Sequence, residues 1–147
     1  MKIIKSCGVR FRREGIYVFS HVNTSSGLAT RIPFLKLDSK ITPELLGQRV
    51  FDALRSVPDV FEEINLREFR SEYANYLLQL GFQNERSFAR AVPFLLVILE
   101  DNIIKVIPHE SDNSGAQLPL HEKTRSCLLD TDVLGRLIVE QSHFCIL

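Results

Sequence analysis

One short pattern occurs twice in this chain, at residues 42–47 (TPELLG) and 130–135 (DTDVLG). Each copy has a polar capping residue, an acidic first turn, an apolar pair and a glycine, and each leads into an apolar helical stripe. Glycine inside a helix costs about 1 kcal/mol relative to alanine, so a helix that keeps one near its start usually needs a close backbone approach. We therefore expect two helices pressed onto one sheet, with Gly47 and Gly135 at the contacts.

Hydrophobic periodicity and turn signals predict an α+β order of elements along the chain. The expected elements are a hairpin over 2–22, a strand over 30–37, helices starting near Thr42 and Asn65, a helical turn over 84–90, strands over 94–99, 103–107 and 123–129, and a closing helix after Asp130. This order predicts an α+β fold with a mostly antiparallel central sheet and three main helices packed on it. No linker divides the chain, so we expect a single domain over residues 1–147.

Prolines and apolar runs predict how the strands are placed. Pro33 assigns its strand to a sheet edge because proline cannot donate to a ladder, and Pro108 is expected to end the strand before it. The continuous apolar run 94–99 is typical of a central strand covered on both faces. Glycine, proline and polar residues over 109–120 predict a mobile loop.

Composition favours a soluble protein of the cytoplasm. The chain has 147 residues, 45% of them apolar, and eighteen basic residues balance eighteen acidic ones. Residues 1–40 carry eight basic and two acidic residues, a net charge of +6, so the remainder carries −6, which hints at a polarised surface. The cysteines are odd in number and widely separated, which favours reduced thiols at Cys7, Cys127 and Cys145. The basic start of the chain is not typical of a secretory signal, and the most apolar stretch, 91–99, is too short to span a bilayer.

The sequence shows no pattern typical of a catalytic or metal site. Of the four histidines and three cysteines, only His143 and Cys145 lie close together, and no CxxC or HExxH spacing is present. The carboxylate pairs 62–63 and 100–101 are adjacent in sequence, so on extended backbone their side chains point to opposite faces. No glycine-rich phosphate loop occurs. We therefore expect no enzymatic activity, metal, cofactor, small-molecule substrate or membrane contact.

Two charged surfaces remain as candidate binding sites. Arg10, Arg12 and Arg13 beside Phe11 could contact a phosphate backbone, although overall neutrality favours a solvated strand face. Acidic residues concentrate in the connectors around residues 59–68 and 100–122, where binding function tends to lie. The residues chosen as candidate contacts are Glu62, Glu63, Asp101, Glu110 and Asp112.

Four features together resemble a known family. They are the Arg10–Arg13 hairpin, the helix that holds Leu46-Gly47 and Ala53-Leu54, the strand pair from Pro93 to Pro108, and the closing Leu134-Gly135 helix. The chain resembles the immunity proteins of bacterial contact-dependent growth inhibition systems, and the resemblance covers nearly all of it. The closing helix departs from the family's form, because His143-Phe144 stand where a small residue would follow the apolar stripe.

The resemblance implies a cytosolic protein that binds the toxic C-terminal domain of a cognate effector in a one-to-one complex. Such toxins are commonly nucleases, whose basic clefts an acidic inhibitor can occupy. Two other functions stay open at this point. The chain could be a small nucleic-acid-binding protein that uses the basic hairpin, or an enzyme with a Cys–His pair formed in space.

Overall fold

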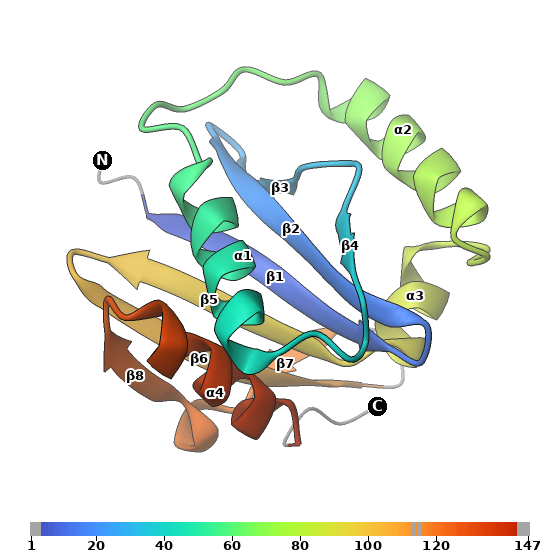
Figure 1. Cartoon of the computed structure of the whole chain (residues 1–147). Helices are drawn as coiled ribbons and strands as arrows, with labels where there is room; N and C mark the ends of the chain where they lie inside the picture. Colours follow the sequence, from blue (N-terminus) through green and yellow to red (C-terminus); the bar gives the residue numbers. More distant parts are fainter. Residues whose placement is uncertain (1–3, 113, 115, 144–147) are drawn as a thin grey trace.

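The computed structural model describes residues 4–112, 114 and 116–143, and one antiparallel sheet forms its centre (Figure 1). Eight strands belong to this sheet in the order β3-β2-β1-β5-β6-β7, with β4 also paired to β2 and β8 to β6. Their bounds are β1 Lys5–Arg12, β2 Gly15–Thr24, β3 Gly27–Thr30, β4 Leu35–Leu37, β5 Phe94–Glu100, β6 Ile103–Ser111, β7 Gln117–Pro119 and β8 Arg125–Leu128. The predicted α+β class and antiparallel sheet are confirmed.

Four helices begin at polar capping residues. They are α1 Pro43–Arg55, α2 Leu66–Gln79, α3 Glu85–Ala91 and α4 Thr131–Ser142, and a short 3₁₀ turn, η1, spans His121–Lys123. The Thr42 hydroxyl accepts the N–H of Leu45, and the Asp130 carboxylate accepts two N–H groups at the start of α4. Each cap satisfies backbone donors that the first turn leaves without helical partners, so the predicted helix starts are confirmed.

Helices α1 and α4 cover one face of the sheet, and Figure 1 shows them side by side in front of β1, β5 and β6. Alternate strand residues point into this layer, where Val9, Val97 and Val106 are fully buried. The helices meet them with fully buried leucine, valine and isoleucine side chains at helical spacing, among them Val50 and Ile138. This layer is the main hydrophobic core.

Gly47 and Gly135 lie at the contact between α1 and α4, which corrects the expectation that they meet the sheet. A Cβ on Gly47 would overlap the carbonyl oxygen of Thr131 and lie 2.8 Å from the nitrogen of Gly135. A Cβ on Gly135 would overlap the carbonyl of Pro43 and lie 3.1 Å from the nitrogen of Gly47. The repeated pattern therefore lets the first turns of the two helices touch backbone to backbone.

A second, aromatic cluster covers one end of the opposite face. Phe34 packs between Tyr17 and Phe19 of β2 and Phe88 of α3. Helix α2 adds Leu77, which is its one buried residue. Helix α2 therefore buries only a small part of its surface, and Figure 1 shows this helix lying away from the centre of the sheet.

Proline placement explains one difference from the predicted strands. The expected strand 30–37 is two short strands, because β3 ends at Thr30 and β4 begins at Leu35, and Pro33 lies in neither. Both strands pair with β2, at its two ends.

Strand β6 continues through Pro108 instead of ending there. The Pro108 carbonyl accepts the Leu120 N–H at 2.8 Å, on the side of β6 away from β5. The N and C=O of one residue point to the same side of an antiparallel strand, so the Pro108 nitrogen, which carries no hydrogen, also points away from β5. It faces the position where the partner of β6 changes from β8 to β7. No ladder bond to β5 is lost. The predicted loop 109–120 is therefore wrong in part, since His109–Ser111 and Gln117–Pro119 form a hairpin arm.

Strand β5 is central, between β1 and β6, but only one of its faces is fully covered. Leu95 and Val97 are fully buried under α1 and α4. Leu96 and Ile98 point to the opposite face and remain half-buried beside an open groove. The expected coverage on both faces is therefore wrong at this end of the strand.

Candidate binding surface

The structure brings three of the five predicted contact residues to the same end of the neighbouring strands β2, β1 and β5. The backbone N–H of Glu62 donates to the carbonyl of Asn23 at 2.8 Å, which holds the α1–α2 connector, with Glu62 and Glu63, against the end of β2. Lys5, at the start of β1, pairs with Leu99 near the end of β5, and the next turn contains Asp101. This set is called the acidic edge and comprises Glu62, Glu63 and Asp101.

Glu110 and Asp112 lie at the other end of β6. From Ile103 to Glu110 an extended strand advances about 3.3 Å per residue, so the two groups are more than about 20 Å apart. Asp112 also has a structural role, because its Oδ1 accepts the N–H groups of Ser114 and Ala116 at 2.8 and 2.9 Å. The five carboxylates therefore do not form one continuous surface.

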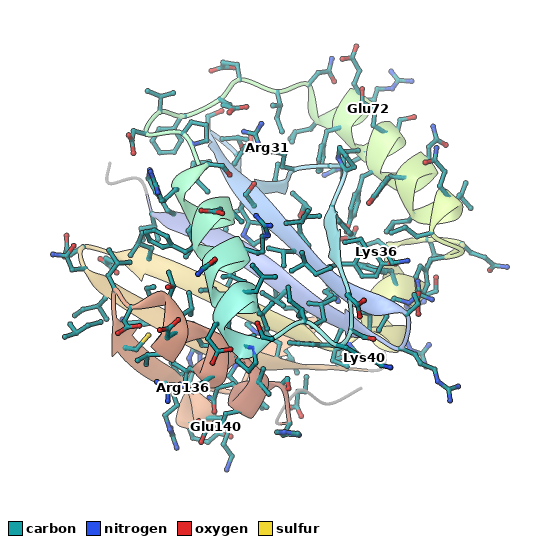
Figure 2. All side chains as sticks on the ribbon, in the orientation of Figure 1. Arg31, Lys36, Lys40, Glu72, Arg136 and Glu140 are labelled. Atoms are coloured by element: carbon teal, nitrogen blue, oxygen red, sulfur yellow. The ribbon has the colours of Figure 1, made fainter. Side chains whose placement is uncertain are left out.

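Cations from residues 1–40, the basic part of the chain, lie beside acidic residues from the remainder. Lys5 Nζ is 3.1 Å from an Asp59 oxygen, and Arg31 Nη2 is 3.0 Å from a Glu62 oxygen. Figure 2 shows Arg31 beneath the connector, and Lys36 and Lys40 lower in the same view. These two ion pairs join the basic residues 1–40 to the acidic remainder of the chain, so the two parts are interleaved at this point. Exposed pairs of this kind contribute at most about 1 kcal/mol.

The predicted basic hairpin does not present its arginines together. Arg10 is 7% exposed, and its guanidinium lies over the rings of Phe88 and Phe94 at 4.4 and 4.7 Å. Its Nη1 donates to the carbonyl of Val92 at 2.9 Å. Arg12 lies over Phe82 and forms an ion pair with Glu14 at 2.8 Å. Of the three, only Arg13 is exposed, so the geometry removes the main support for a phosphate-binding hairpin.

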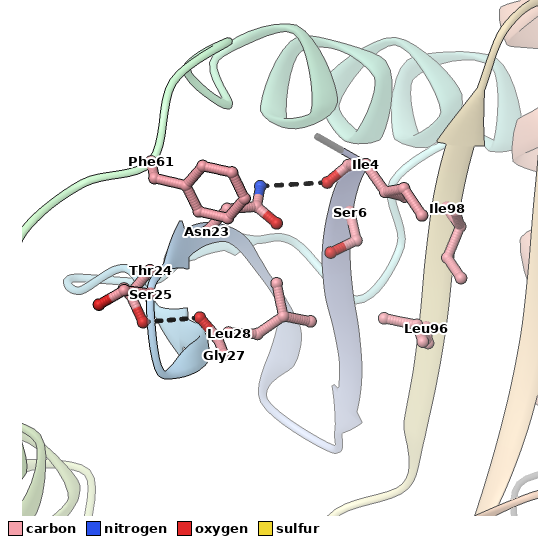
Figure 3. Close-up of a pocket in the computed structure, with 10 residues that line it drawn as sticks. All are labelled: Ile4, Ser6, Asn23, Thr24, Ser25, Gly27, Leu28, Phe61, Leu96 and Ile98. Atoms are coloured by element: carbon pink, nitrogen blue, oxygen red, sulfur yellow. Dashed lines mark hydrogen bonds between the residues drawn. The ribbon is translucent and has the colours of Figure 1, made fainter. Parts of the chain in front are cut away.

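An apolar groove of about 490 Å³ opens on the half-covered face of the sheet, next to the acidic edge. Its floor is Leu96 and Ile98 of β5 with Ser6 of β1, and Leu28 of β3 and Phe61 of the connector flank it. In Figure 3, Leu28, Ser6 and Leu96 point into the same space. Sequence reasoning missed this site. Its one local signal is the apolar pair Val60-Phe61 inside an otherwise acidic connector.

A buried polar pair lies beside the groove floor, on the same face of the sheet. The Ser6 hydroxyl and His21 Nδ1 share a hydrogen bond of 2.9 Å, and the Phe19 ring packs edge-on against the imidazole. Burial, together with the positive charge of Arg10, lowers the pKa of His21 to about 4. His21 is therefore neutral near pH 7. In a Ser–His–Asp triad a third, polar group orients the histidine, whereas the ring neighbour of His21 is Phe19.

The remaining thiols and histidines are dispersed. Cys7 is fully buried, and burial raises the pKa of its thiol. Burial also raises the pKa of Cys127, which is half-buried at the other side of the core. Within the described ranges no three His, Cys, Asp or Glu side chains gather to hold a metal ion. Cys145, one member of the closely spaced pair with His143, lies outside the described residues.

The fold is shared with proteins of known structure. The chain matches no protein-family profile and no curated protein sequence. A Neisseria meningitidis protein of unknown function has a similar structure, with a TM-score of 0.82 and 14% identity over 99% of this chain and 97% of that one. A chain of the CdiA-CT/CdiI toxin and immunity complex from Yersinia pseudotuberculosis has a TM-score of 0.72 and 13% identity, over 95% of this chain and 97% of that one. At these identities the likeness is one of fold. None of the described helices is long and apolar enough to cross a membrane.

Proposed function

We propose that this chain is an immunity protein that binds the C-terminal toxin domain of a contact-dependent growth inhibition effector and neutralises it. The observation that carries this proposal is the likeness of nearly the whole chain to a chain of a CdiA-CT/CdiI toxin and immunity complex. A shared fold alone does not establish function, so the proposal also depends on a suitable surface. The acidic edge and the adjacent apolar groove supply one.

The chemistry of the surface suits a basic partner such as a nuclease. A nuclease holds a polyanion in a basic cleft, and carboxylates that occupy this cleft would exclude the substrate. Complementary charge also speeds the encounter and disfavours wrong partners. On this proposal the protein acts in the cytoplasm in a one-to-one complex, as a single domain, and inhibits by occupying the toxin without catalysing a reaction.

Co-purification with a toxin domain tests the proposal directly. The toxin domain is taken from the effector gene beside the gene for this chain, and a toxin domain from an unrelated effector is the control. We expect a one-to-one complex by light scattering with the first domain and none with the second, and survival only of cells that express the matched pair. Failure of the purified chain to bind or protect against the adjacent toxin would reject the function.

A further inference from the structure

We propose that α2 and α3 form an acid-sensitive layer: when the buried histidines His21 and His109 take up protons, this layer detaches from the sheet while α1 and α4 stay in place. This conformational change is independent of the proposed function. Three features of the structure support it, namely the packing of the two histidines, the positive charge beside them, and the separation of the α2–α3 layer from the main core.

His21 is connected to α2 by a run of aromatic rings. Its imidazole is 8% exposed, and the Phe19 ring packs edge-on against it with 5.7 Å between the ring centroids. Phe34 stacks on Phe19 at 4.5 Å, and the Tyr76 hydroxyl of α2 accepts the N–H of Phe34 at 2.9 Å. The ring that packs against His21 is therefore held in place through contacts that lead to α2.

His109 is connected to α3 in a similar way. It is 7% exposed, and its ring centroid lies 4.8 Å from that of Phe94. The Arg10 guanidinium lies over both Phe94 and the Phe88 ring of α3. Two residues further along β6, the Ser111 hydroxyl donates to a backbone carbonyl of α3 at 2.6 Å. Helix α3 therefore lies over the end of β6 that contains His109.

A proton on either histidine adds positive charge near Arg10. Burial first, and then the charge of Arg10, lowers the pKa of His21 to about 4. Burial also lowers the pKa of His109, and Arg10 and His121 of η1 lower it further, while the hydrogen bond to the Ile107 carbonyl opposes them. Both histidines are therefore neutral at pH 7 with the layer closed, and both resist protonation as the pH falls.

The α2–α3 layer turns little compensating charge toward these groups. Tyr73 of α2 stays neutral, because burial raises its pKa to about 12, with Arg10 acting against this shift. Glu85, at the start of α3, acts on Tyr73 but is exposed, and the groups that shift the pKa of the two histidines do not include it. A proton on either histidine is thus disfavoured as long as the layer stays closed.

The layer on the opposite face has no such groups. The buried residues of the main core are apolar side chains and Cys7, whose thiol stays protonated because burial raises its pKa, and none of the described histidines belongs to this core. Figure 1 shows α2 and α3 apart from α1 and α4. Helix α2 buries only Leu77, whereas α1 buries three large apolar side chains, so release of α2 exposes less apolar surface. Acid should therefore open the α2–α3 layer first.

Linkage sets the size of the effect. An open layer exposes the histidines, which then bind protons at their ordinary pKa of about 6.5. With a pKa of about 4 in the closed layer, His21 alone raises the equilibrium constant for opening about thirtyfold between pH 7.5 and pH 5. His109 raises it further, because its pKa is also lowered. The effect is absent above about pH 7.5, grows as the pH falls from 6.5 to 4, and then levels off.

Hydrogen exchange at pH 7.5 and pH 5 measures the opening of each helix. Protection factors, corrected for the intrinsic exchange rate at each pH, are compared between α3 with residues 73–79 of α2 and the helices α1 and α4. The variants are His21→Gln and His109→Gln, singly and together. His143→Asn, which changes an exposed histidine at the end of α4, is the matched control.

Tyrosine gives a second, independent measurement. The three tyrosines of the chain, Tyr17, Tyr73 and Tyr76, all belong to the aromatic cluster, and the chain has no tryptophan. The near-ultraviolet circular dichroism of tyrosine therefore reports on this cluster, and the far-ultraviolet signal reports on all the helices. Urea unfolding followed with both signals shows whether the two transitions coincide.

We expect protection of α3 and residues 73–79 to fall at least about thirtyfold from pH 7.5 to pH 5, and that of α1 and α4 to change less than about threefold. At pH 5 urea should remove the tyrosine signal before the far-ultraviolet signal, with a smaller gap at pH 7.5. The double variant should lose most of this pH dependence, and His143→Asn should keep it.

Two outcomes would overturn the inference. Equal loss of protection in all four helices would show that acid acts on the whole fold. Full pH dependence in the double variant would show that other groups bind the protons. His109→Gln keeps the assignment testable if His21→Gln fails to fold, and the comparison of helices in the unmodified chain needs no variant.

Discussion

Gly47 in α1 and Gly135 in α4 face each other where the two helices cross, and neither position has room for a Cβ. The groups that such a Cβ would meet are backbone atoms of the opposite helix, which cannot move aside as a flexible side chain can. The two copies of the repeated sequence pattern therefore form the two sides of one contact between α1 and α4. It brings α1 and α4 close enough to cover β1, β5 and β6 with a single layer.

The first prediction concerns this contact. Gly47→Val and Gly135→Val should each lower the free energy of unfolding by at least about 1–3 kcal/mol, because the added atoms force the helices apart. The double variant should cost less than the sum, since one substitution already separates the pair. Urea unfolding measures all three. Gln48→Val, exposed on the same helix, controls for the helix propensity of valine. Equal stability of the Gly47 and Gln48 variants would contradict the close contact.

The second prediction assigns Arg10 a structural role. Its guanidinium stacks on Phe88 and Phe94 and donates to the Val92 carbonyl, so Arg10→Ala should remove packing and leave a buried acceptor without this donor. We expect a loss of about 2–4 kcal/mol. Arg13→Ala, at an exposed position, should change stability by less than about 0.5 kcal/mol. Thermal and urea unfolding compare the two. A stable Arg10→Ala protein with weakened RNA binding would instead restore the nucleic-acid hypothesis.

The third prediction is a loss of stability in acid. The folded state holds the pKa of His21 at about 4, below its ordinary 6.5, so between these values the unfolded state binds a proton that the folded state does not. The free energy of unfolding should therefore fall as pH drops from 6.5 to 4, by up to about 3 kcal/mol from this residue. His21→Gln should flatten the pH profile, and His121→Asn, at an exposed position, should not. His109 is also buried with a lowered pKa, so some slope should remain. An unchanged slope in His21→Gln would contradict the burial.

The fourth prediction orders the thiols by reactivity. Burial raises the pKa of Cys7, which is inaccessible in the core, whereas Cys127 is only half-buried. Iodoacetamide should therefore modify Cys127 in the native protein well before Cys7, because the thiolate is the reactive form. All three cysteines, Cys145 included, should react after unfolding without a reductant. Mass spectrometry of timed samples follows the order, and faster labelling of Cys7 would show that the core opens.

Local signals in the sequence were sufficient for most of the elements. Thr42, Asn65, Asn84 and Asp130 each accept backbone N–H groups at the start of a helix, and this depends only on the next three residues. The Asp101 turn is equally local, with a positive φ of 55° that aspartate tolerates. Such features are predictable because their causes lie within one turn of the chain.

Features that depend on distant residues were not predictable. The sequence around Arg10 is typical of a solvated strand, and its burial depends on the Phe88 ring of α3, which is distant in sequence. The run 94–99 is equally apolar whether one face or both are covered, so the groove beside Leu96 stayed hidden. The five candidate carboxylates were chosen from two acidic connectors, and a strand over 103–107 was already predicted between Asp101 and Glu110. The structure extends this strand to Ser111, so Asp101 and Glu110 lie at opposite ends of β6.

The last prediction concerns the acidic residues, which the structure separates into the acidic edge and the pair Glu110 and Asp112. Neutralising the acidic edge with Glu62→Gln, Glu63→Gln and Asp101→Asn should slow association with the toxin domain and reduce protection of cells. Glutamine keeps a partner for Arg31, and asparagine tolerates the positive φ at 101, so folding should be preserved. Reversal to lysine would disturb both positions and confuse the result.

The matched variant is Glu110→Gln with Asp112→Asn, at the opposite end of β6, where asparagine can still accept the loop N–H groups of Ser114 and Ala116. Because charge mainly affects the encounter, stopped-flow association rates at low and high salt are the measurement. We expect the edge variant to associate more slowly and with a weaker salt dependence, and the Glu110 and Asp112 variant to match the unmodified chain. The reverse outcome would move the interface to the β6–β7 arm, and no effect from either variant would mean that these carboxylates serve solubility alone.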